Sequence, residues 1–525
     1  MLIRQKAVKT IAAAFCAITV MGAALGIPAQ AASAAAPYNI TIGIGSAETE
    51  VRFCWQSGNS AAGQLQIAKT SDMKNNSFPA SSTKQATVAK MTATEGVLDN
   101  PKNTDQSIGS FQDESGAALS DEYSDKVTVG GLVPNTSYTY RVGDGTNWSK
   151  TYTFQTKSAK DGFSFAAFGD PQMGASGNLA NDQAGWANTL KKVYSKYPSL
   201  NFLFSMGDQV NNYDHLYTQQ KEYNAFFNPD SSVDYLQTHI LAAYSGNHDF
   251  QMGKYYSFHY NQPNLSTLGQ TKTNNVDDNN GDYWFRYGNT LFLVLEGNNF
   301  YDVSAHDAFL KQAIDANKGA KWKVVSFHQA PYSEANHDGA TSADDDTMFM
   351  RKNWTKLMDK YQIDIVLNGH DHYYTRTYQM YGGSAVSTVK KGQVTNPKGT
   401  VYLTLDSGSG SKYYKYNATA DHSFSAAGWQ NNEPTYTYAK VTGDTFTLTT
   451  YTTSSDTPID TYTITKTSAS PTAAVSTTTP ASTASNPKTG DREGGTYLYA
   501  ALAALALIVA AGCIAALRKK PTARS

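Results

Sequence analysis

Five short blocks in the middle of the chain decide its fold: Gly169-Asp170-Pro171-Gln172, Gly207-Asp208, Gly246-Asn247-His248-Asp249, Phe327-His328 and Gly369-His370-Asp371-His372. Each block supplies one or two oxygen or imidazole ligands, and most follow an apolar run that is rich in β-forming residues. Open α/β sheets place their sites just past the carboxyl ends of strands. The ordered set therefore predicts a sheet that gathers these side chains at one rim. The dipeptide Gly-Asp alone decides nothing, because it occurs six times in the chain.

The composition is that of a folded chain with two or three domains. Of its 525 residues, 43 are Lys or Arg and 44 are Asp or Glu. This balance excludes a basic field that would bind nucleic acid and an acidic disordered tail. A hydrophobic content of 40% with many Tyr and Phe fits packed, strand-rich domains.

The amino-terminal segment, residues 1–31, is typical of a secretory signal peptide. Arg4, Lys6 and Lys9 precede an apolar stretch over 11–27, and Ala29-Gln30-Ala31 provides a small-x-small cleavage site. A true membrane span is the alternative, which small residues and Pro28 in the run disfavour. We therefore expect the protein to be secreted.

The carboxyl-terminal segment, residues 486–525, resembles the sorting signal of Gram-positive surface proteins. Asn486-Pro487-Lys488-Thr489-Gly490 precedes an apolar stretch over 497–517, which is long enough to cross a bilayer, and a cationic end over 518–520. The resemblance implies cleavage by a sortase after Thr489 and linkage to peptidoglycan, so the membrane holds the chain only before sorting. Asn486 replaces the usual Leu, which leaves the sortase class open. A plain single-span anchor is the alternative.

The cysteine count gives no intramolecular disulfide. Cys16 lies in the signal peptide and Cys513 in the tail, so the mature wall-linked form keeps Cys54 alone. Cys54 stands in the strand-like run Val51–Trp55 and is interpreted as a small buried apolar residue.

Residues 37–157 are predicted to form short strands separated by turns. The expected strands are 38–44, 50–56, 63–68, 126–129, 138–142 and 150–155. The stretch from Gly131 to Val142 resembles a fibronectin type III domain near its tyrosine corner, where a Tyr hydroxyl bonds to the turn backbone. Tyr138 is the expected corner residue and Leu132 its core partner. The polar segment 71–120 is long for a sandwich loop and is expected to contain an insertion.

Residues 161–466 are predicted to form an α/β domain. Apolar strands at 163–168, 200–206, 239–244, 321–327 and 363–367 lead into the five blocks, and helices are expected at 181–197, 217–227, 304–317 and 346–361. Strands are expected again at 436–441, 445–451 and 461–466. Residues 467–488 are rich in Ser, Thr, Pro and Ala and are expected to be an unfolded linker across the wall.

The side chains of the five blocks suit the hydrolysis of a phosphate ester. This reaction needs a nucleophilic hydroxide and neutralisation of the phosphoryl oxygens. Two cations about 3.5–4 Å apart supply both, because they lower the pKa of a shared water and clamp the attacking and leaving oxygens. Their ligands combine carboxylate oxygen with imidazole nitrogen, and the blocks offer this combination without a cysteine.

The ordered blocks resemble the calcineurin-like metallophosphoesterases, and in particular the purple acid phosphatases, over about residues 38–466. The resemblance implies a multidomain chain, in which an all-β sandwich precedes a four-layer αββα domain with a dinuclear metal site. It implies that Asp170 and His372 bind the first metal, that Asp208 bridges, and that Asn247, His328 and His370 bind the second metal. His248 would face the phosphate or protonate the leaving alcohol, with Asn247 beside the substrate. Asp249 would orient the His248 imidazole or hold its proton.

Two positions depart from the related families. Gln172 stands where the wider superfamily has His, and it is predicted to bind the first metal or to lie beside it. Asn211 stands where purple acid phosphatases have the Tyr that colours the iron. We therefore expect no tyrosinate–iron band, and Fe, Zn and Mn all remain open as the metals.

The sequence favours a wall-anchored phosphomonoesterase. His337 is predicted to contact substrate, whereas His215, His239, His259, His306 and His422 are interpreted as surface or packing residues. A phosphodiesterase or nucleotide hydrolase of the same fold is one alternative. A surface adhesin with an inactive phosphoesterase domain is another.

Overall fold

The computed structural model describes residues 36–92, 94–97, 111–273, 276–277, 280–335, 337 and 345–467. The predicted signal peptide, the wall linker beyond Thr467 and the sorting signal with its apolar stretch lie outside these residues. The described residues form one compact unit. Among the described residues, no helix is both long and apolar enough to cross a membrane.

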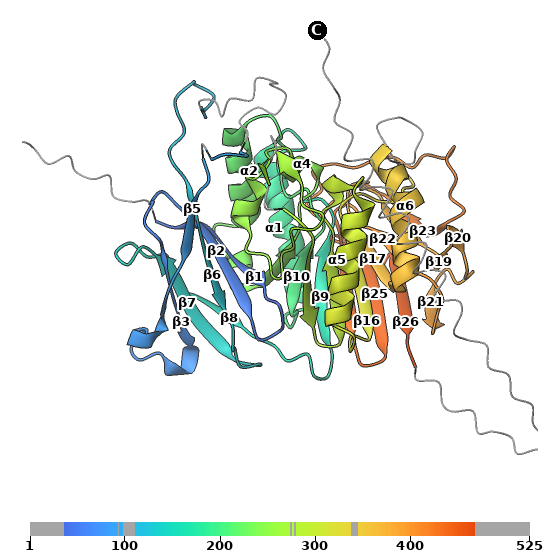
Figure 1. Ribbon diagram of the computed structural model, residues 1–525, viewed down its shortest axis with the longest axis horizontal. Helices are drawn as coiled ribbons and strands as arrows, with labels where there is room; N and C mark the ends of the chain where they lie inside the picture. The colour runs from blue at the N-terminus through green and yellow to red at the C-terminus, as the bar shows by residue number, and fades with distance from the viewer. Residues whose placement is uncertain are drawn as a thin grey trace, which may run out of the picture. The chain divides into compact units, whose positions relative to one another are not determined.

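The amino-terminal part is the expected β-sandwich (Figure 1). One layer contains β1 (Tyr38–Ile44), β2 (Val51–Ser57), β6 (Tyr123–Val129) and β5 (Thr87–Lys90). The other contains β4 (Thr83–Gln85), β3 (Gln64–Lys69), β7 (Ser137–Gly143) and β8 (Tyr152–Gln155), with the short 3-10 helices η1 (Thr70–Asp72) and η2 (Ala80–Ser82). Strands β4 and β5 lie in the polar segment where an insertion was expected.

The tyrosine corner and the buried cysteine of the sandwich are confirmed. The Val133 backbone N–H donates to the Tyr138 hydroxyl at 2.9 Å, and Leu132 is buried beside it. Phe53 packs against the ring of Tyr140 with centroids 4.8 Å apart. Cys54 in β2 is fully buried and is not in a disulfide.

The sandwich and the following domain share one sheet. Strand β1 pairs in parallel with β11 (Ile240–Ala243), with Ile42 opposite Ile240 and Gly43 opposite Leu241. The sheet therefore has eleven strands in the order β21-β26-β25-β24-β9-β10-β11-β1-β2-β6-β5. Its other strands are β9 (Phe163–Phe168), β10 (Phe202–Ser205), β21 (Gly392–Thr395), β24 (Thr435–Val441), β25 (Thr445–Thr452) and β26 (Asp460–Thr465).

A second sheet has seven strands in the order β14-β15-β16-β17-β22-β18-β23. These strands are β14 (Tyr283–Tyr287), β15 (Thr290–Val294), β16 (Trp322–Ser326), β17 (Ile365–Asn368), β18 (Tyr374–Thr377), β22 (Val401–Thr404) and β23 (Ser425–Trp429). Two-stranded pairs are formed by β12 (Lys272–Thr273) with β13 (Val276–Asp277) and by β19 (Met380–Tyr381) with β20 (Ser384–Ala385).

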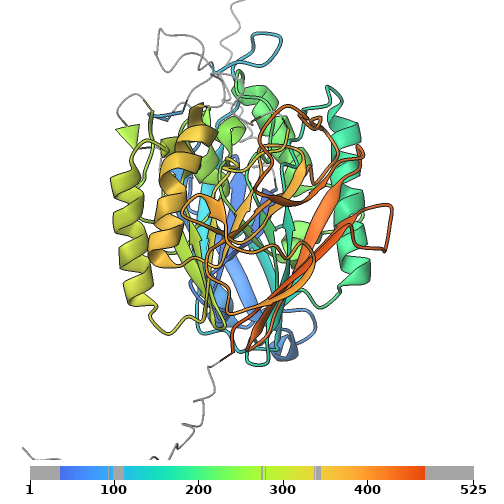
Figure 2. The same ribbon diagram turned by 90° about the vertical axis from the view of Figure 1, so that its right-hand side faces the viewer.

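The domain has four layers, as Figure 2 shows, with helices outside both sheets. Helices α1 (Leu179–Lys196) and α2 (Leu216–Phe227) pack their apolar side chains on the large sheet. Helices α5 (Val303–Ala316) and α6 (Asp345–Tyr361) cover the second sheet. The short helices are α3 (Tyr235–Thr238), α4 (Asn247–Phe250), η3 (Tyr256–His259) and η4 (Gly297–Asn299).

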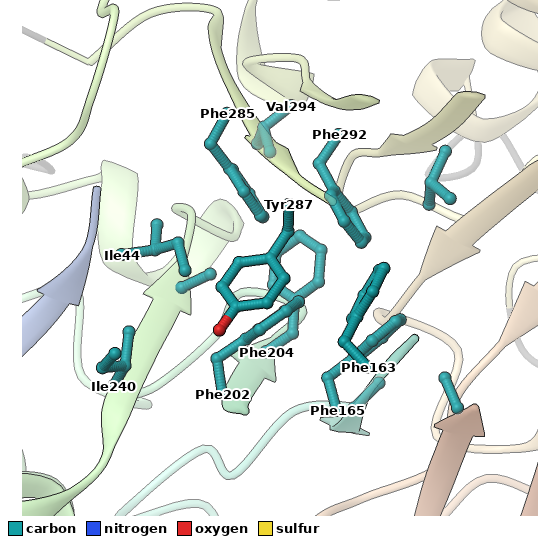
Figure 3. Packing of buried hydrophobic residues seen from close by; sticks show 14 of the residues in the cluster. Ile44, Phe163, Phe165, Phe202, Phe204, Ile240, Phe285, Tyr287, Phe292 and Val294 are labelled. Carbon is teal, nitrogen blue, oxygen red and sulfur yellow. The ribbon is translucent and has the colours of Figure 1, made fainter. Parts of the chain in front are cut away.

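Aromatic side chains fill the space between the two sheets (Figure 3). Phe165 from the large sheet stacks on Phe202 with centroids 4.9 Å apart, and Phe292 of the second sheet meets Phe165 edge-on at 5.5 Å. Such pairs add directional preference to the burial of apolar area. The two sheets are therefore held face to face, which aligns their strand ends at a common rim.

Candidate metal centre

The predicted ligands meet where strands of both sheets end. Asp170, Asp208 and Asn247 follow β9, β10 and β11, which are parallel neighbours in the large sheet. His328 and the pair His370 and His372 follow β16 and β17, which are parallel neighbours in the second sheet. Parallel neighbours end on the same side, so each sheet presents its donors at one edge. The packing of the sheets brings the two edges together.

The donor atoms lie close enough to share cations. Atoms of Asp170, Asp208 and His328 all lie within 4.8 Å of one another. The Nε2 atom of His328 is 3.3 Å from Asp208 Oδ2 and 3.2 Å from His370 Nδ1. His372 Nε2 is 3.1 Å from Asp170 Oδ2. Carboxylate and imidazole donors thus alternate across one small volume.

Hydrogen bonds fix which imidazole nitrogen faces this volume. His328 Nδ1 donates to the Met206 carbonyl at 2.8 Å, and His372 Nδ1 donates to the Lys412 carbonyl at 2.9 Å. A carbonyl only accepts, so each Nδ1 carries the hydrogen and each neutral ring keeps its lone pair on Nε2. This second-layer bonding is how metal-binding histidines are oriented in proteins.

Three buried oxygens at the rim have no hydrogen-bond partner: Asp170 Oδ2, Gln172 Oε1 and Asn247 Oδ1. Buried polar atoms of folded proteins nearly always have a partner, and an unpaired carboxylate oxygen is costly. Three unpartnered oxygens from separate segments, beside two imidazoles whose Nε2 atoms face the same volume, fit the donor set of bound metal ions.

The carboxylates also make the site strongly attractive to positive charge. Burial alone would lower the pKa of His328, but Asp208 and Asp170 raise it to about 10. Burial alone would raise the pKa of Asp208, but His328 and His248 lower it well below its usual value. A cation between these groups would satisfy both carboxylates.

The backbone at four site residues is left-handed. The φ angles are 35° at Gln172, 44° at Asp208, 75° at His370 and 44° at His372. Apart from Asn residues, Gln362 is the one other described non-glycine residue with positive φ. Such conformations cost of order 1–3 kcal/mol each and persist where the surrounding structure enforces them, which is common at functional sites.

The structure corrects the expected partner of His248. The backbone N–H of His248 donates to Asp208 Oδ1 at 2.9 Å, and its ring Nδ1 donates to the Asn211 carbonyl at 2.5 Å. Its Nε2 lies 4.0 Å from Asp208 Oδ2, at the metal centre. The Asn211 carbonyl, and not Asp249, therefore orients this imidazole.

Asp249 instead connects the loops of the site to each other and to Tyr223 of helix α2. Its carboxylate accepts from the Tyr223 hydroxyl at 2.9 Å, from the Gly246 N–H at 3.0 Å and from the Gln209 N–H at 3.2 Å. Burial and the nearby Asp208 charge raise its pKa well above the usual value. It holds together the two loops that carry Asp208 and Asn247.

The remaining predicted residues also lie at the rim. The amide nitrogen of Gln172 donates to Asn211 Oδ1 at 3.3 Å, which leaves the Gln172 oxygen as the group without a partner. The His337 ring stacks on His370 with centroids 3.9 Å apart, and its backbone N–H donates to Asp371 Oδ1 at 3.1 Å. Contact of His337 with substrate stays a prediction.

The segment that wraps His372 was not predicted from the sequence. Besides the bond to the Lys412 carbonyl, the Tyr414 N–H donates to the His372 carbonyl at 3.2 Å, and the two rings are 5.0 Å apart. This segment follows a Ser- and Gly-rich stretch after β22 and carries no metal-ligand pattern. Its one sequence signal was a cluster of aromatic and basic residues after the stretch from Asp406 to Ser411.

Two protein-family models match the chain. The model described as purple acid phosphatase, N-terminal domain matches residues 37–156, and the model described as calcineurin-like phosphoesterase matches residues 163–374. The second match includes all the predicted site residues, from Asp170 to His372.

Curated relatives are distant in sequence. The chain is 25% identical over 300 residues to a probable inactive purple acid phosphatase 24 of Arabidopsis thaliana, covering 53% of this chain and 48% of the relative. It is 22% identical over 275 residues to a nucleotide pyrophosphatase/phosphodiesterase of Hordeum vulgare, covering 50% of this chain and 73% of the relative. The chain spans about half the length of the Arabidopsis relatives that it matches.

A solved structure shares the fold. The purple acid phosphatase from yellow lupin (Lupinus luteus) seeds aligns with a TM-score of 0.62 and 17% identity, over 82% of this chain and 74% of that chain. With the β-sandwich, the four layers and the buried Asp/His group, these matches agree on both parts of the molecule. The chain therefore joins a β-sandwich that matches the purple acid phosphatase N-terminal domain to an α/β domain that matches the calcineurin-like phosphoesterases.

Proposed function

We propose that the chain is an extracellular, wall-anchored hydrolase that cleaves phosphomonoesters in preference to diesters and uses two metal ions. The observation that supports this most directly is the shared rim, where Asp170, Asp208 and His328 converge within 4.8 Å of one another. A mixed carboxylate and imidazole set of this kind binds Fe, Zn or Mn, and two such ions act together in phosphoester hydrolysis.

The residues of the rim divide into two ligand sets in this proposal. Asp170, Gln172 and His372 hold the first ion, Asp208 bridges, and Asn247, His328 and His370 hold the second. When bound, the ions neutralise charge on the phosphoryl group and activate water for attack. The unpartnered oxygens of Asp170, Gln172 and Asn247 support these assignments.

His248 is the proposed proton donor. Its Nδ1 is committed to the Asn211 carbonyl, so Nε2 is the nitrogen that turns to the centre. In its charged form this nitrogen donates to a phosphate oxygen or to the leaving alcohol. The bond to Asn211 holds the ring at one angle for that transfer.

Two alternatives compete with this function. The similarity to a nucleotide pyrophosphatase/phosphodiesterase of Hordeum vulgare favours an enzyme of that kind, and the similarity to probable inactive phosphatases of Arabidopsis thaliana favours a phosphoesterase domain without activity, here a surface adhesin. Against the inactive domain stands the retention of every predicted donor at the rim.

The decisive experiment combines metal analysis with hydrolysis of p-nitrophenyl phosphate and of its bis ester. We expect bound metal, faster turnover of the monoester, and loss of most activity and metal in Asp208→Asn. Asp456→Asn removes an exposed charge and serves as the matched control. A metal-free wild type with the same null activity as Asp208→Asn would show that the domain is inactive, and a preference for the bis ester would reverse the substrate order.

The visible absorption of the protein tests whether a tyrosinate binds the first metal ion. Asn211 occupies the position of the iron-binding tyrosine, and its carbonyl and side chain are bonded to His248 and Gln172. We expect metal-loaded protein to lack the visible tyrosinate–iron absorption band. An absorption spectrum of purified protein with a band in the purple region would contradict this expectation.

Wall anchoring is tested through the motif at 486–490. Thr489→Ala should stop sortase cleavage, so that the protein remains in the membrane fraction and is no longer released by peptidoglycan hydrolases. Thr478→Ala, in the predicted linker, is the matched control. Unchanged wall attachment in Thr489→Ala would exclude this sorting route.

A further inference from the structure

We propose that Lys412 and Tyr414 form a substrate-binding pair that recognises the second negative charge of a phosphomonoester, which deepens and rests on the proposed function. The two residues lie on the segment that wraps His372. None of the five sequence blocks contains them. Their geometry bears on the choice between monoester and diester.

The segment is fixed to the metal centre by its backbone. The Lys412 carbonyl accepts from His372 Nδ1 at 2.9 Å, and the Tyr414 N–H donates to the His372 carbonyl at 3.2 Å. These two bonds hold residues 412–414 beside a predicted metal ligand. A side chain on this segment is therefore positioned with little freedom relative to the site.

The Tyr414 ring forms part of the wall of the site. Its centroid lies 5.0 Å from that of His372 and 5.6 Å from that of His337, in both cases with the rings steeply inclined. The ring of Tyr414 therefore lies beside a predicted metal ligand and beside a predicted substrate contact.

Lys412 adds a positive charge beside this ring. Its ammonium lies 5.1 Å from the Tyr414 ring centroid. The pair thus places an ammonium and a phenolic O–H in the wall of the site, and both residues are half-buried.

Such a pair favours a dianion. Above the second pKa of a phosphate monoester, about 6, the monoester carries close to two charges whereas a diester carries one. A charge-assisted hydrogen bond is about twice as strong as a neutral one, so the additional anionic oxygen of a monoester gains most from it. In a diester a second carbon substituent replaces that oxygen.

The test compares two substrates and one control variant. For Lys412→Met we expect kcat/KM for p-nitrophenyl phosphate to fall by about 10- to 100-fold, the loss typical of one hydrogen bond to a charged group. For bis(p-nitrophenyl) phosphate the fall should be less than about threefold, because that substrate lacks the second charge. Tyr414→Phe should also lower the ratio of kcat/KM for the monoester to kcat/KM for the diester. Lys412→Arg should keep this ratio closer to the wild-type value than Lys412→Met does. Lys415→Met removes an exposed lysine from the same segment and should leave both rates unchanged.

A binding measurement separates this inference from the proposed activity. Calorimetry on metal-loaded protein should show that Lys412→Met weakens the binding of inorganic phosphate by the same factor as it lowers kcat/KM for the monoester. The binding of dimethyl phosphate should be nearly unaffected. If the wild type hydrolyses neither ester, the proposed function fails and the binding result alone decides the inference. Equal losses for both substrates and both ligands, or no loss for any, would overturn the role of the pair.

Discussion

Glycine at the ligand blocks leaves room for neighbouring ligands. A Cβ atom at Gly246 would lie 2.0 Å from Asp208 Oδ1, and one at Gly369 would lie 2.2 Å from Asp170 Oδ1. Real Cβ atoms do not approach oxygen this closely, so the ligand or the backbone would have to move. These two glycines bring strand ends from different parts of the chain into contact.

Gly246→Ala should damage the metal centre for this steric reason alone, because φ at Gly246 is −94° and suits any residue. We expect metal content and kcat to fall at least about tenfold and the free energy of unfolding to fall by about 1–3 kcal/mol. Gly443→Ala is the control, since a Cβ atom there meets nothing within 4 Å. Its free energy of unfolding should stay within about 0.5 kcal/mol of the wild-type value. Metal analysis measures the metal content and urea unfolding measures the free energy of unfolding. Full metal content in Gly246→Ala would show that the loop relaxes freely.

His306 is a buried packing residue, one of the two interpretations given above, and it lies between two hydrogen-bond acceptors. Its Nδ1 lies 2.9 Å from Asp282 Oδ2 and its Nε2 lies 3.1 Å from the Asn299 carbonyl. Both ring nitrogens therefore donate, which requires the charged imidazolium. Burial alone would lower the pKa of His306, but Asp282, Asn299 and the Glu296 charge raise it.

The raised pKa predicts a loss of stability at alkaline pH. The folded-state value lies above the unfolded value of about 6.5, so the stabilisation is complete below about pH 6.5 and is lost as pH rises through the folded-state value. The difference in unfolding free energy between wild type and His306→Gln should therefore shrink from about pH 6 to about pH 9. Urea unfolding at each pH measures it. A difference that grows with pH would contradict the assigned charge.

At the scale of elements, helix α2 is the support of His248. Glu222 Oε2 accepts from the N–H groups of Asn211 and Asn212 at 2.9 and 2.7 Å. One turn earlier, Gln219 donates to the Asn212 carbonyl at 2.9 Å. The helix thus fixes the loop whose Asn211 carbonyl orients the His248 ring.

Glu222→Ala should lower kcat with little change in KM, because His248 loses its orientation while the metal ligands stay. We expect a fall of about 10- to 100-fold, typical of the loss of positioned proton transfer. Burial raises the pKa of Glu222 to about 8, so near neutrality the carboxyl is protonated and Glu222→Gln should keep most activity. Lys221→Ala, exposed on the same helix, is the control. A parallel loss in Glu222→Gln and Glu222→Ala would point to a general folding defect.

The strands and helices that were predicted correctly are those in which the spacing of apolar residues along the chain clearly indicates one type of element. Strands β1 and β9 have the predicted bounds, and α1, α2, α5 and α6 differ from prediction by one or two residues. The hairpin of β14 and β15 was not predicted, although its alternation from Tyr283 to Tyr287 is regular. Its strands bury Phe285 and Phe292 against the large sheet, a partner that no local pattern reveals.

At the scale of the whole molecule, the parallel pair of β1 and β11 makes one sheet of two sequence domains. Further contacts cross the same boundary: the Tyr140 hydroxyl donates to the Gln237 carbonyl at 2.7 Å, and the amide of Gln237 donates to the Ile40 carbonyl at 3.0 Å. Removal of the sandwich would expose the edge of β11. Exposed hydrophobic edges promote aggregation.

We therefore expect one cooperative unfolding transition for residues 36–467, and we expect residues 161–467 alone to aggregate or to melt at a lower temperature. Scanning calorimetry and size-exclusion chromatography test both. The control is the fragment of residues 36–467 with the substitution Val133→Ala, which changes an exposed position of the sandwich. This variant should unfold like the unsubstituted fragment. Two separate transitions, or a monomeric and active fragment, would show that the shared sheet adds no stability.

The sequence by itself determined the two-domain order, the αββα class and the residues of the rim, because ligands just past apolar strands leave a local signature. It also identified Tyr138 and Leu132 at the tyrosine corner. The tertiary structure alone decided that Asn211 orients His248, that Asp249 holds two loops together, and that residues 412–414 wrap His372. Each of these is a contact between segments 26 or more residues apart. Such contacts depend on how the two sheets pack, and side-chain type or spacing along the chain does not encode them.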